Sequence, residues 1–140
     1  MTRLSKCLAA VEQHSGLNAW TQMLTPSGVS DGMIFGIKDN FCVKDSKTTA
    51  GSKMLQDFIA PYDATAVHRI RESGGVILGK TNMDEFGMGS YGVTSYFGPT
   101  FSPNGRVAGG SSSGSAAAVA SGMCEVAIGK LMISNSNSEQ

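Results

Sequence analysis

Apolar residues recur within the first 15 positions at the spacing of one helix face. Leu4, Leu8 and Val11 lie among charged and polar residues, which predicts an amphipathic helix over residues 1–15. Two basic residues precede the first acidic one, so a weak mitochondrial address is the alternative interpretation. The segment has few Arg and Ser residues and lacks the features of a secretory signal, which favours the helix.

Two short apolar runs on either side of a helical pattern predict a strand–helix–strand unit. Residues 33–37 and 76–78 are apolar and bounded by glycine or polar residues, as buried strands are. Between them, residues 64–70 place apolar side chains on one helix face. Asp63 is expected to cap the amino end of this helix, and the glycine pair 74–75 to end it. Tight turns between such elements indicate parallel strands.

The second half of the chain is less periodic and richer in glycine. Residues 80–106 show no lasting period apart from a short helical turn expected at 81–86. A long irregular stretch inside a compact domain is more often functional than idle. Residues 109–115 form a Gly/Ser-rich turn that leads into an alanine-rich helix at 116–120, and residues 125–129 predict a third strand.

Composition narrows the class of protein. The chain has 140 residues, 41% hydrophobic and 16% charged, with eleven basic and eleven acidic residues, which argues against disorder and against a dedicated nucleic-acid binder. No apolar run approaches the roughly 20 residues that cross a bilayer. Three cysteines without a CxxC pair and two scattered histidines predict neither a disulfide scaffold nor a metal site, and they fit a reducing compartment.

Three features could carry chemistry, and each has a plain structural interpretation. Residues 109–115 are either a flexible linker or turn, or a helix start whose N–H groups and hydroxyls face negative charge. Lys38 is either a surface lysine at a strand end or a buried base that serves a serine. Asp84 and Glu85 are adjacent on a predicted turn and point to different sides, so we expect a cap or surface turn rather than an acid/base pair.

Four motifs occur in the order found in the amidase signature family. They are GIKDNF at 36–41, TAGSKML at 49–55, GKTNMDEF at 79–86 and GGSSSGSAAA at 109–118. The chain resembles that family over residues 18–129. The string 75–92 is similar to the branch that forms the A subunits of glutamyl-tRNA(Gln) amidotransferases. The resemblance implies an α/β fold, namely the amino-terminal part of a mixed β-sheet flanked by helices, which is incomplete here.

The resemblance also implies a Ser–cis-Ser–Lys triad. Lys38 would be the base, and Ser111, held in a cis peptide, would relay the proton between lysine and nucleophile. Ser112 would support them by hydrogen bonding, while Ser113 stands where the family has a glycine. No metal is implied. Substrate contacts are assigned by the same resemblance to Gly87, Met88 and Gly89.

The sequence departs from the family after Gly129. The nucleophilic serine of the family falls at Asn135, and neither flanking serine follows a Gly-Gly pair that could build an oxyanion hole. We therefore expect residues 1–129 to be the amino-terminal portion of an amidase domain and residues 130–140 to be a divergent, disordered tail. A truncated or misread gene model, such as a retained intron, would explain that tail. The chain as written is predicted to be inactive alone.

For the parent enzyme, the resemblance implies hydrolysis of glutamine through an acyl-enzyme. The ammonia would convert Glu-tRNA(Gln) to Gln-tRNA(Gln) in a partner subunit of a heteromeric complex. ATP and Mg²⁺ would be used by that partner, which would also make most tRNA contacts, so no cofactor is expected in this chain. The compartment would be the mitochondrial matrix in a eukaryote and the cytoplasm otherwise. Two alternatives remain: another amidase-signature hydrolase, acting on fatty-acid or small aliphatic amides, or a non-catalytic form that only binds partner subunits.

Overall fold

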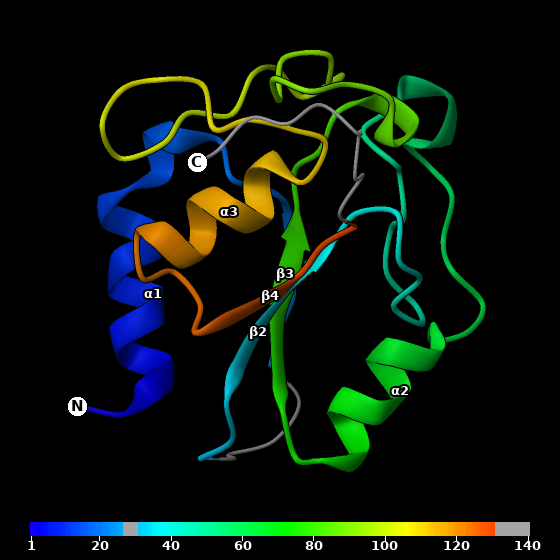
Figure 1. Ribbon diagram of the computed structural model, residues 1–140. Helices are drawn as coiled ribbons and strands as arrows, with labels where there is room; N and C mark the ends of the chain where they lie inside the picture. The colour runs from blue at the N-terminus through cyan, green and yellow to red at the C-terminus, as the bar shows by residue number, and fades with distance from the viewer. Residues whose placement is uncertain (27–30, 131–140) are drawn as a thin grey trace, which may run out of the picture.

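The computed structural model describes residues 1–26 and 31–130. A four-stranded sheet forms the middle layer, with helices α1 and α3 on one face and α2 on the other (Figure 1). This confirms the predicted α/β fold with a mixed sheet flanked by helices. The helices are α1 (Arg3–Gln13), α2 (Thr65–Glu72) and α3 (Ser113–Ala120); the strands are β1 (Trp20–Met23), β2 (Ile34–Lys38), β3 (Val76–Thr81) and β4 (Val126–Ile128); and the short 3₁₀ turns are η1 (Ser15–Leu17), η2 (Lys53–Leu55) and η3 (Glu85–Gly87).

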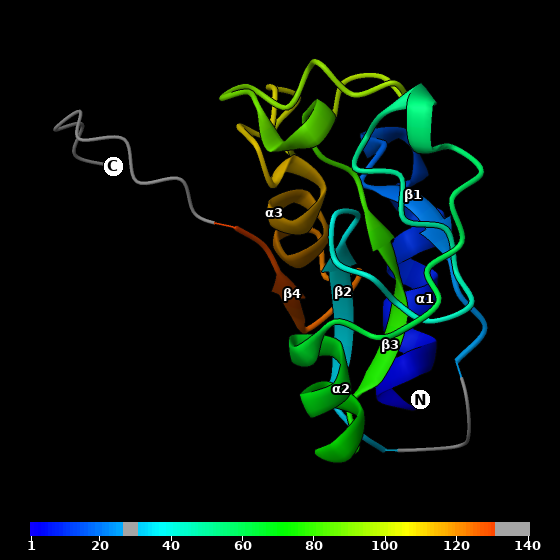
Figure 2. The same ribbon diagram turned by 90° about the vertical axis from the view of Figure 1, so that its right-hand side faces the viewer.

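The strands follow the order β1-β3-β2-β4, with β1 and β4 at the two edges (Figure 2). Strand β2 pairs in parallel with both β3 and β4, whereas β1 runs antiparallel to β3. Helix α2 connects β2 to β3, so the predicted strand–helix–strand unit is present. Because β2, β3 and β4 run in the same direction, their carboxyl ends meet at one edge of the sheet, where sites of α/β proteins form.

The core lies on both faces of the sheet, because successive side chains of a strand point in opposite directions. Ile34 of β2 and Leu78 of β3 belong to the cluster covered by α1 and α3. Ile37 packs with Val67 of α2 on the other face. The same alternation directs Lys38 toward α3. Within the described residues, no helix has the length and apolar character needed to cross a membrane.

Helix α3 lies close to the sheet because its first turns are built from small residues. The Gly114 amide donates to the carbonyl of Asn82 at 2.9 Å. A Cβ at Gly114 would collide with the backbone of Ala19 and of Asn82, so only glycine permits this approach. The contact places the start of α3 directly at the carboxyl end of β3, beside β2.

Several boundaries differ from the predicted ones. Strand β1 was not predicted: three of its residues are only partly buried, Met23 is exposed, and a bulge interrupts its pairing with β3. Strand β3 ends at Thr81, three residues later than predicted. Helix α3 begins at Ser113, three residues earlier than predicted. The helical turn expected at 81–86 is the shorter η3. These additional residues are mostly polar, and their partners lie far away in the sequence.

The predicted cap of α2 is wrong. Ala64 occupies the capping position and makes no side-chain cap. The Asp63 carboxylate instead accepts from the Lys44 backbone N at 2.7 Å and from Arg71 Nε at 3.0 Å. Asp63 therefore ties the loop after β2 to the last turn of α2.

Candidate functional site

Three side chains from two distant segments meet at the carboxyl end of β2. Lys38 ends that strand, while Ser111 and Ser112 directly precede α3. Lys38 Nζ lies 2.8 Å from Ser111 Oγ and 2.7 Å from Ser112 Oγ. Lys38 has no exposed surface, and Ser111 is 3% exposed. The interpretation of Lys38 as a surface lysine is therefore wrong, and the structure brings together the residues that the motifs singled out as base, relay and support.

The turn before α3 is fixed on both sides rather than being a flexible linker. Its Gly110–Ser111 peptide bond is cis, the form that the resemblance implies for the relay serine. The Gly110 amide donates to the carbonyl of Ser90 at 2.8 Å, and the Asp84 amide donates to the carbonyl of Ser111 at 3.1 Å. A Cβ at Gly110 would collide with the Asp84 carboxylate, which explains the need for glycine there.

Hydrogen bonding gives the two serines different roles. Ser112 Oγ donates to the Lys130 carbonyl and accepts from the Lys130 amide, each at 3.1 Å. A hydroxyl has one proton, so Ser112 accepts from Lys38. Within residues 1–26 and 31–130, the Ser111 hydroxyl has Lys38 as its one partner. Its proton can therefore turn toward the lysine nitrogen when that amine is neutral, which fits the relay role that the resemblance implies for Ser111.

Burial is the main influence on the charge of Lys38. Loss of hydration disfavours the ammonium and lowers the pKa of Lys38 from 10.5 to about 8. The Asp84 carboxylate opposes this shift, and the Lys130 ammonium adds to it. At pH 7 roughly one-tenth of such a lysine is neutral. A pKa close to the working pH is what general-base catalysis requires.

The role predicted for Asp84 as a cap or surface residue is wrong. It makes no side-chain cap to η3, and its buried carboxylate instead holds the backbone of residues 92–94. Oδ1 accepts from the amides of Val93 and Thr94 at 2.9 and 3.0 Å and from Thr94 Oγ1 at 2.9 Å, while Oδ2 accepts from Gly92 N at 3.0 Å. Burial raises the pKa of Asp84, but these bonds, led by those from Thr94, outweigh it and keep that pKa below its usual value. The carboxylate is therefore charged at neutral pH.

The segment predicted to contact substrate runs beside Ser111. A Cβ at Gly87 would lie 3.9 Å from Ser111 Oγ, which is van der Waals distance. Met88 is 72% exposed. Gly89 leaves room for Asp84, because a Cβ there would collide with that carboxyl group. Gly87 thus borders Ser111, and the contact of all three residues with substrate stays a prediction.

A second buried lysine, which the sequence analysis did not single out, lies on the neighbouring strand. Lys80 Nζ donates to Asp39 Oδ1 at 2.9 Å, to the Lys47 carbonyl at 3.0 Å and to Thr48 Oγ1 at 3.0 Å. Asp39 also accepts a short hydrogen bond from Thr49 Oγ1. Burial lowers the pKa of Lys80, and Asp39 opposes that shift. The available sequence signal was a lysine one glycine beyond an apolar strand.

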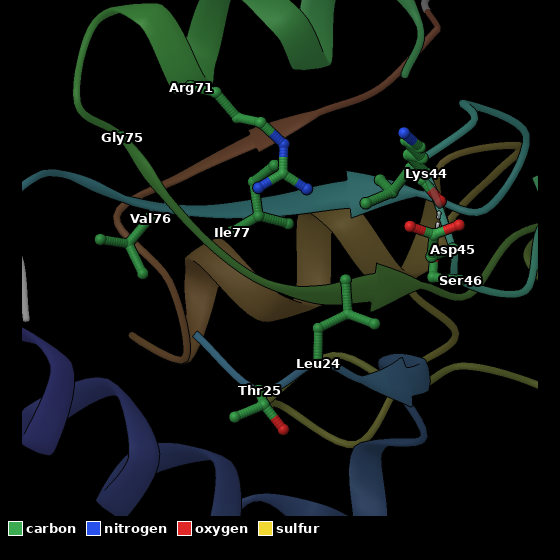
Figure 3. A pocket seen from close by; sticks show the side chains of 10 residues that line it. Leu24, Thr25, Lys44, Asp45, Ser46, Arg71, Gly75, Val76 and Ile77 are labelled. Carbon is green, nitrogen blue, oxygen red and sulfur yellow. Dashed lines mark hydrogen bonds between the residues drawn. The ribbon is translucent and has the colours of Figure 1, made fainter. Parts of the chain in front are cut away.

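A pocket of about 200 Å³ lies away from these lysines, between α2 and the loop after β2 (Figure 3). Arg71 extends over Ile77 on one side, and Lys44 and Asp45 lie on the other. A second cavity, of about 360 Å³, borders the buried pair at Asp39. Neither cavity is lined by Lys38 or Ser111. We assign the candidate site to the contacts around Lys38, because these contacts join the residues that the motifs singled out.

Two further expectations concern metal and nucleophile. Among the residues that the structure describes, no group of three His, Cys, Asp or Glu is placed to hold a metal ion. The predicted nucleophile position, Asn135, and the rest of the tail at 131–140 lie outside the described residues. The backbone of Lys130, the first residue of that tail, is hydrogen-bonded to Ser112 Oγ.

Comparison with known proteins places these motifs in a family. The family model described as Amidase matches residues 7–130. The A subunit of the mitochondrial glutamyl-tRNA(Gln) amidotransferase of Drosophila pseudoobscura pseudoobscura is 52% identical over 116 residues, covering 77% of this chain and 23% of that protein. The corresponding protein of Natronomonas pharaonis is 55% identical over 107 residues, covering 75% and 25% respectively. The chain thus spans about a quarter of the length of these curated relatives.

Solved structures agree with this assignment. The A subunit of glutamyl-tRNA(Gln) amidotransferase from Thermotoga maritima superposes with a TM-score of 0.82 and 36% identity, covering 90% of this chain and 30% of that one. A 6-aminohexanoate cyclic dimer hydrolase gives a TM-score of 0.80 and 31% identity, covering 91% and 30%. The sheet and its helices are therefore a fragment of a larger fold that these enzymes share. By motif, family model and structure, the chain belongs to the amidase family.

Proposed function

We propose that this chain carries the base and the proton relay of an amide-hydrolysing site. It would correspond to the amino-terminal portion of the glutaminase subunit of a glutamyl-tRNA(Gln) amidotransferase. The observation that carries the proposal is the 2.8 Å contact between Lys38 Nζ and Ser111 Oγ. Burial lowers the pKa of Lys38 to about 8, so this lysine can accept a proton near neutral pH.

In the proposed reaction, neutral Lys38 takes the hydroxyl proton of Ser111, and Ser111 takes the proton of the nucleophilic serine. That serine oxygen bonds to the side-chain amide carbon of glutamine. The carbon–nitrogen bond then breaks, and the relay returns a proton so that ammonia leaves. Water hydrolyses the resulting acyl-enzyme by the same relay. In the parent enzyme the nucleophile would follow β4, and the bonds from Ser112 to Lys130 hold the start of that segment beside the lysine.

Sequence identity favours this substrate over the other amides of the family. Among the solved structures, the amidotransferase A subunit of Thermotoga maritima is 36% identical to this chain and the cyclic dimer hydrolase 31%. The two curated amidotransferase relatives above are 52% and 55% identical over the residues aligned. In the proposed assembly, ammonia passes to a partner subunit, where ATP and Mg²⁺ serve the amidation of Glu-tRNA(Gln). A formal net charge of zero suits a protein that leaves most tRNA contacts to its partner. The compartment would be the mitochondrial matrix or the cytoplasm, according to the source.

The test transplants the segment into a complete enzyme. Residues 1–129 replace the corresponding part of the Thermotoga maritima protein, the chimera is assembled with its partner subunits, and glutaminase turnover is measured. Lys38→Met, Lys38→Arg and Ser111→Ala should each lower kcat/KM by about 100- to 10,000-fold, because arginine stays protonated and methionine has no basic group. The exposed Lys44→Met is the matched control. Full turnover in Lys38→Met would overturn the proposal.

A further inference from the structure

We propose that Asp84 is a positioning residue for this site: its amide holds the backbone of Ser111, its carboxylate holds the turn at 92–94, and its negative charge acts on Lys38. The inference rests on the proposed function, since it gives Asp84 a role only in relation to Lys38 as the base. Asp84 would touch neither substrate nor the reacting carbon.

Asp84 forms hydrogen bonds to both loops beside this site. Its amide donates to the Ser111 carbonyl at 3.1 Å, which fixes the backbone of the relay serine. Its carboxylate accepts four hydrogen bonds of 2.9–3.0 Å from residues 92–94. Two glycines leave the space that the carboxyl group fills, since a Cβ at Gly89 or Gly110 would collide with it. Asp84 itself has no exposed surface.

Among the described residues, Asp84 is the carboxylate whose charge acts on Lys38. Ser111 and Ser112 are neutral, and Lys130 is a cation that favours the neutral amine. Asp39 is next to Lys38 in the sequence, but its carboxylate is engaged by Lys80 and Thr49. The carboxylate of Asp84 is therefore the negative group that offsets the burial of the Lys38 ammonium. Such a balance keeps the lysine from losing its proton at too low a pH.

The sign of one shift separates this role from a merely structural one. Asp84→Asn keeps the shape of the side chain and removes its charge, so the titration midpoint of Lys38 should fall below its wild-type value of about 8. A substitution that only loosened the loop would admit water to Lys38. Hydration favours the ammonium, so the midpoint would then rise toward its ordinary value of 10.5.

The experiment uses the full 140-residue chain. Lysine side chains are labelled with ¹³C, and the Lys38 signal, identified by its loss in Lys38→Arg, is followed by NMR from pH 6 to 11. We expect Asp84→Asn to lower the midpoint by at least about half a pH unit. Glu85→Gln is the matched control, because it removes an exposed charge one residue away, and it should leave the midpoint unchanged. An unchanged or higher midpoint in Asp84→Asn overturns the inference.

A second measurement needs no Asp84 variant and decides the matter if Asp84→Asn does not fold. In the wild-type chain, the ¹³Cγ shift of Asp84 should show an inflection near pH 8, where Lys38 titrates, and Lys38→Met should abolish it. Absence of that inflection overturns the inference. Neither measurement depends on turnover, so a failure here counts against Asp84 alone. An active Lys38→Met chimera would count against the proposed function instead.

Discussion

Lys80→Met is expected to destabilise the fold by about 3–5 kcal/mol, because it leaves a buried carboxylate without its cation. Lys80 and Asp39 are 0% and 1% exposed, and their charged atoms lie 2.9 Å apart. The lysine makes two further hydrogen bonds at 3.0 Å, to Lys47 and Thr48, which the variant also loses. After the substitution, Asp39 retains the hydroxyl of Thr49 as a partner, and this cannot replace a positive charge.

The chain contains a matched control in an exposed pair of the same residue types. Lys47 Nζ lies 3.6 Å from Asp57 Oδ1, with side chains 49% and 83% exposed. Water screens that pair, so Lys47→Met should cost at most about 0.5 kcal/mol. The double variant Lys80→Met/Asp39→Asn removes the unpaired charge while keeping an acceptor for Thr49. It should recover about 2 kcal/mol of the loss seen in Lys80→Met alone.

Urea unfolding followed by circular dichroism measures these differences. With a slope of about 2 kcal/mol per molar urea, the loss in Lys80→Met lowers the midpoint by about 1.5–2.5 M. The corresponding change for Lys47→Met is below about 0.3 M. A Lys80→Met variant as stable as the control would refute the argument from burial. A double variant no more stable than Lys80→Met would refute the explanation by unpaired charge.

Three further outcomes are expected. The purified 140-residue chain should hydrolyse no glutamine, because the motif count predicts Asn135 at the position of the family's nucleophile; measurable release of glutamate would contradict this. In the chimera, glutaminase kcat/KM should rise with pH and level off above about 8, because the neutral fraction of Lys38 grows as the pH passes the pKa of that lysine. A flat profile from pH 6 to 9 would argue against Lys38 as the base. Gly110→Ala should cost about 1–3 kcal/mol in thermal or urea unfolding, because its Cβ collides with Asp84; Gly16→Ala, with nothing within 4 Å, should be close to neutral.

Periodicity predicted those elements whose burial involves apolar residues. Strand β2 is mostly apolar and was located to within one residue. Strand β3 was predicted too short, because Lys80 and Thr81 are polar and fully buried. Such residues can lie inside only if they have partners, and the partners of Lys80 lie 32 to 41 residues earlier in the chain. No local pattern carries that information.

The candidate site came from the order of four motifs rather than from spacing. Lys38 and Ser111 are 73 residues apart, and each alone had an ordinary structural interpretation. Asp84 was misjudged because its carboxylate bonds to residues 8 to 10 positions later, in a stretch without periodicity. A turn of that kind is defined by its hydrogen bonds, which the sequence does not display.

The two buried lysines show how the fold separates a structural charge from a chemical base. Ile37, which faces α2, pairs with Lys80, whereas Lys38 pairs with Thr81, whose hydroxyl bonds to Ser115 of α3. The lysines therefore lie on opposite faces of the sheet. Lys80 has a carboxylate and two further oxygens to receive its three protons. Lys38 forms hydrogen bonds to two hydroxyls, and the Asp84 carboxylate acts on it through charge without a direct hydrogen bond. Removing a proton therefore costs less at Lys38, and the sheet keeps the ion pair that stabilises the fold apart from the amine proposed to act as the base.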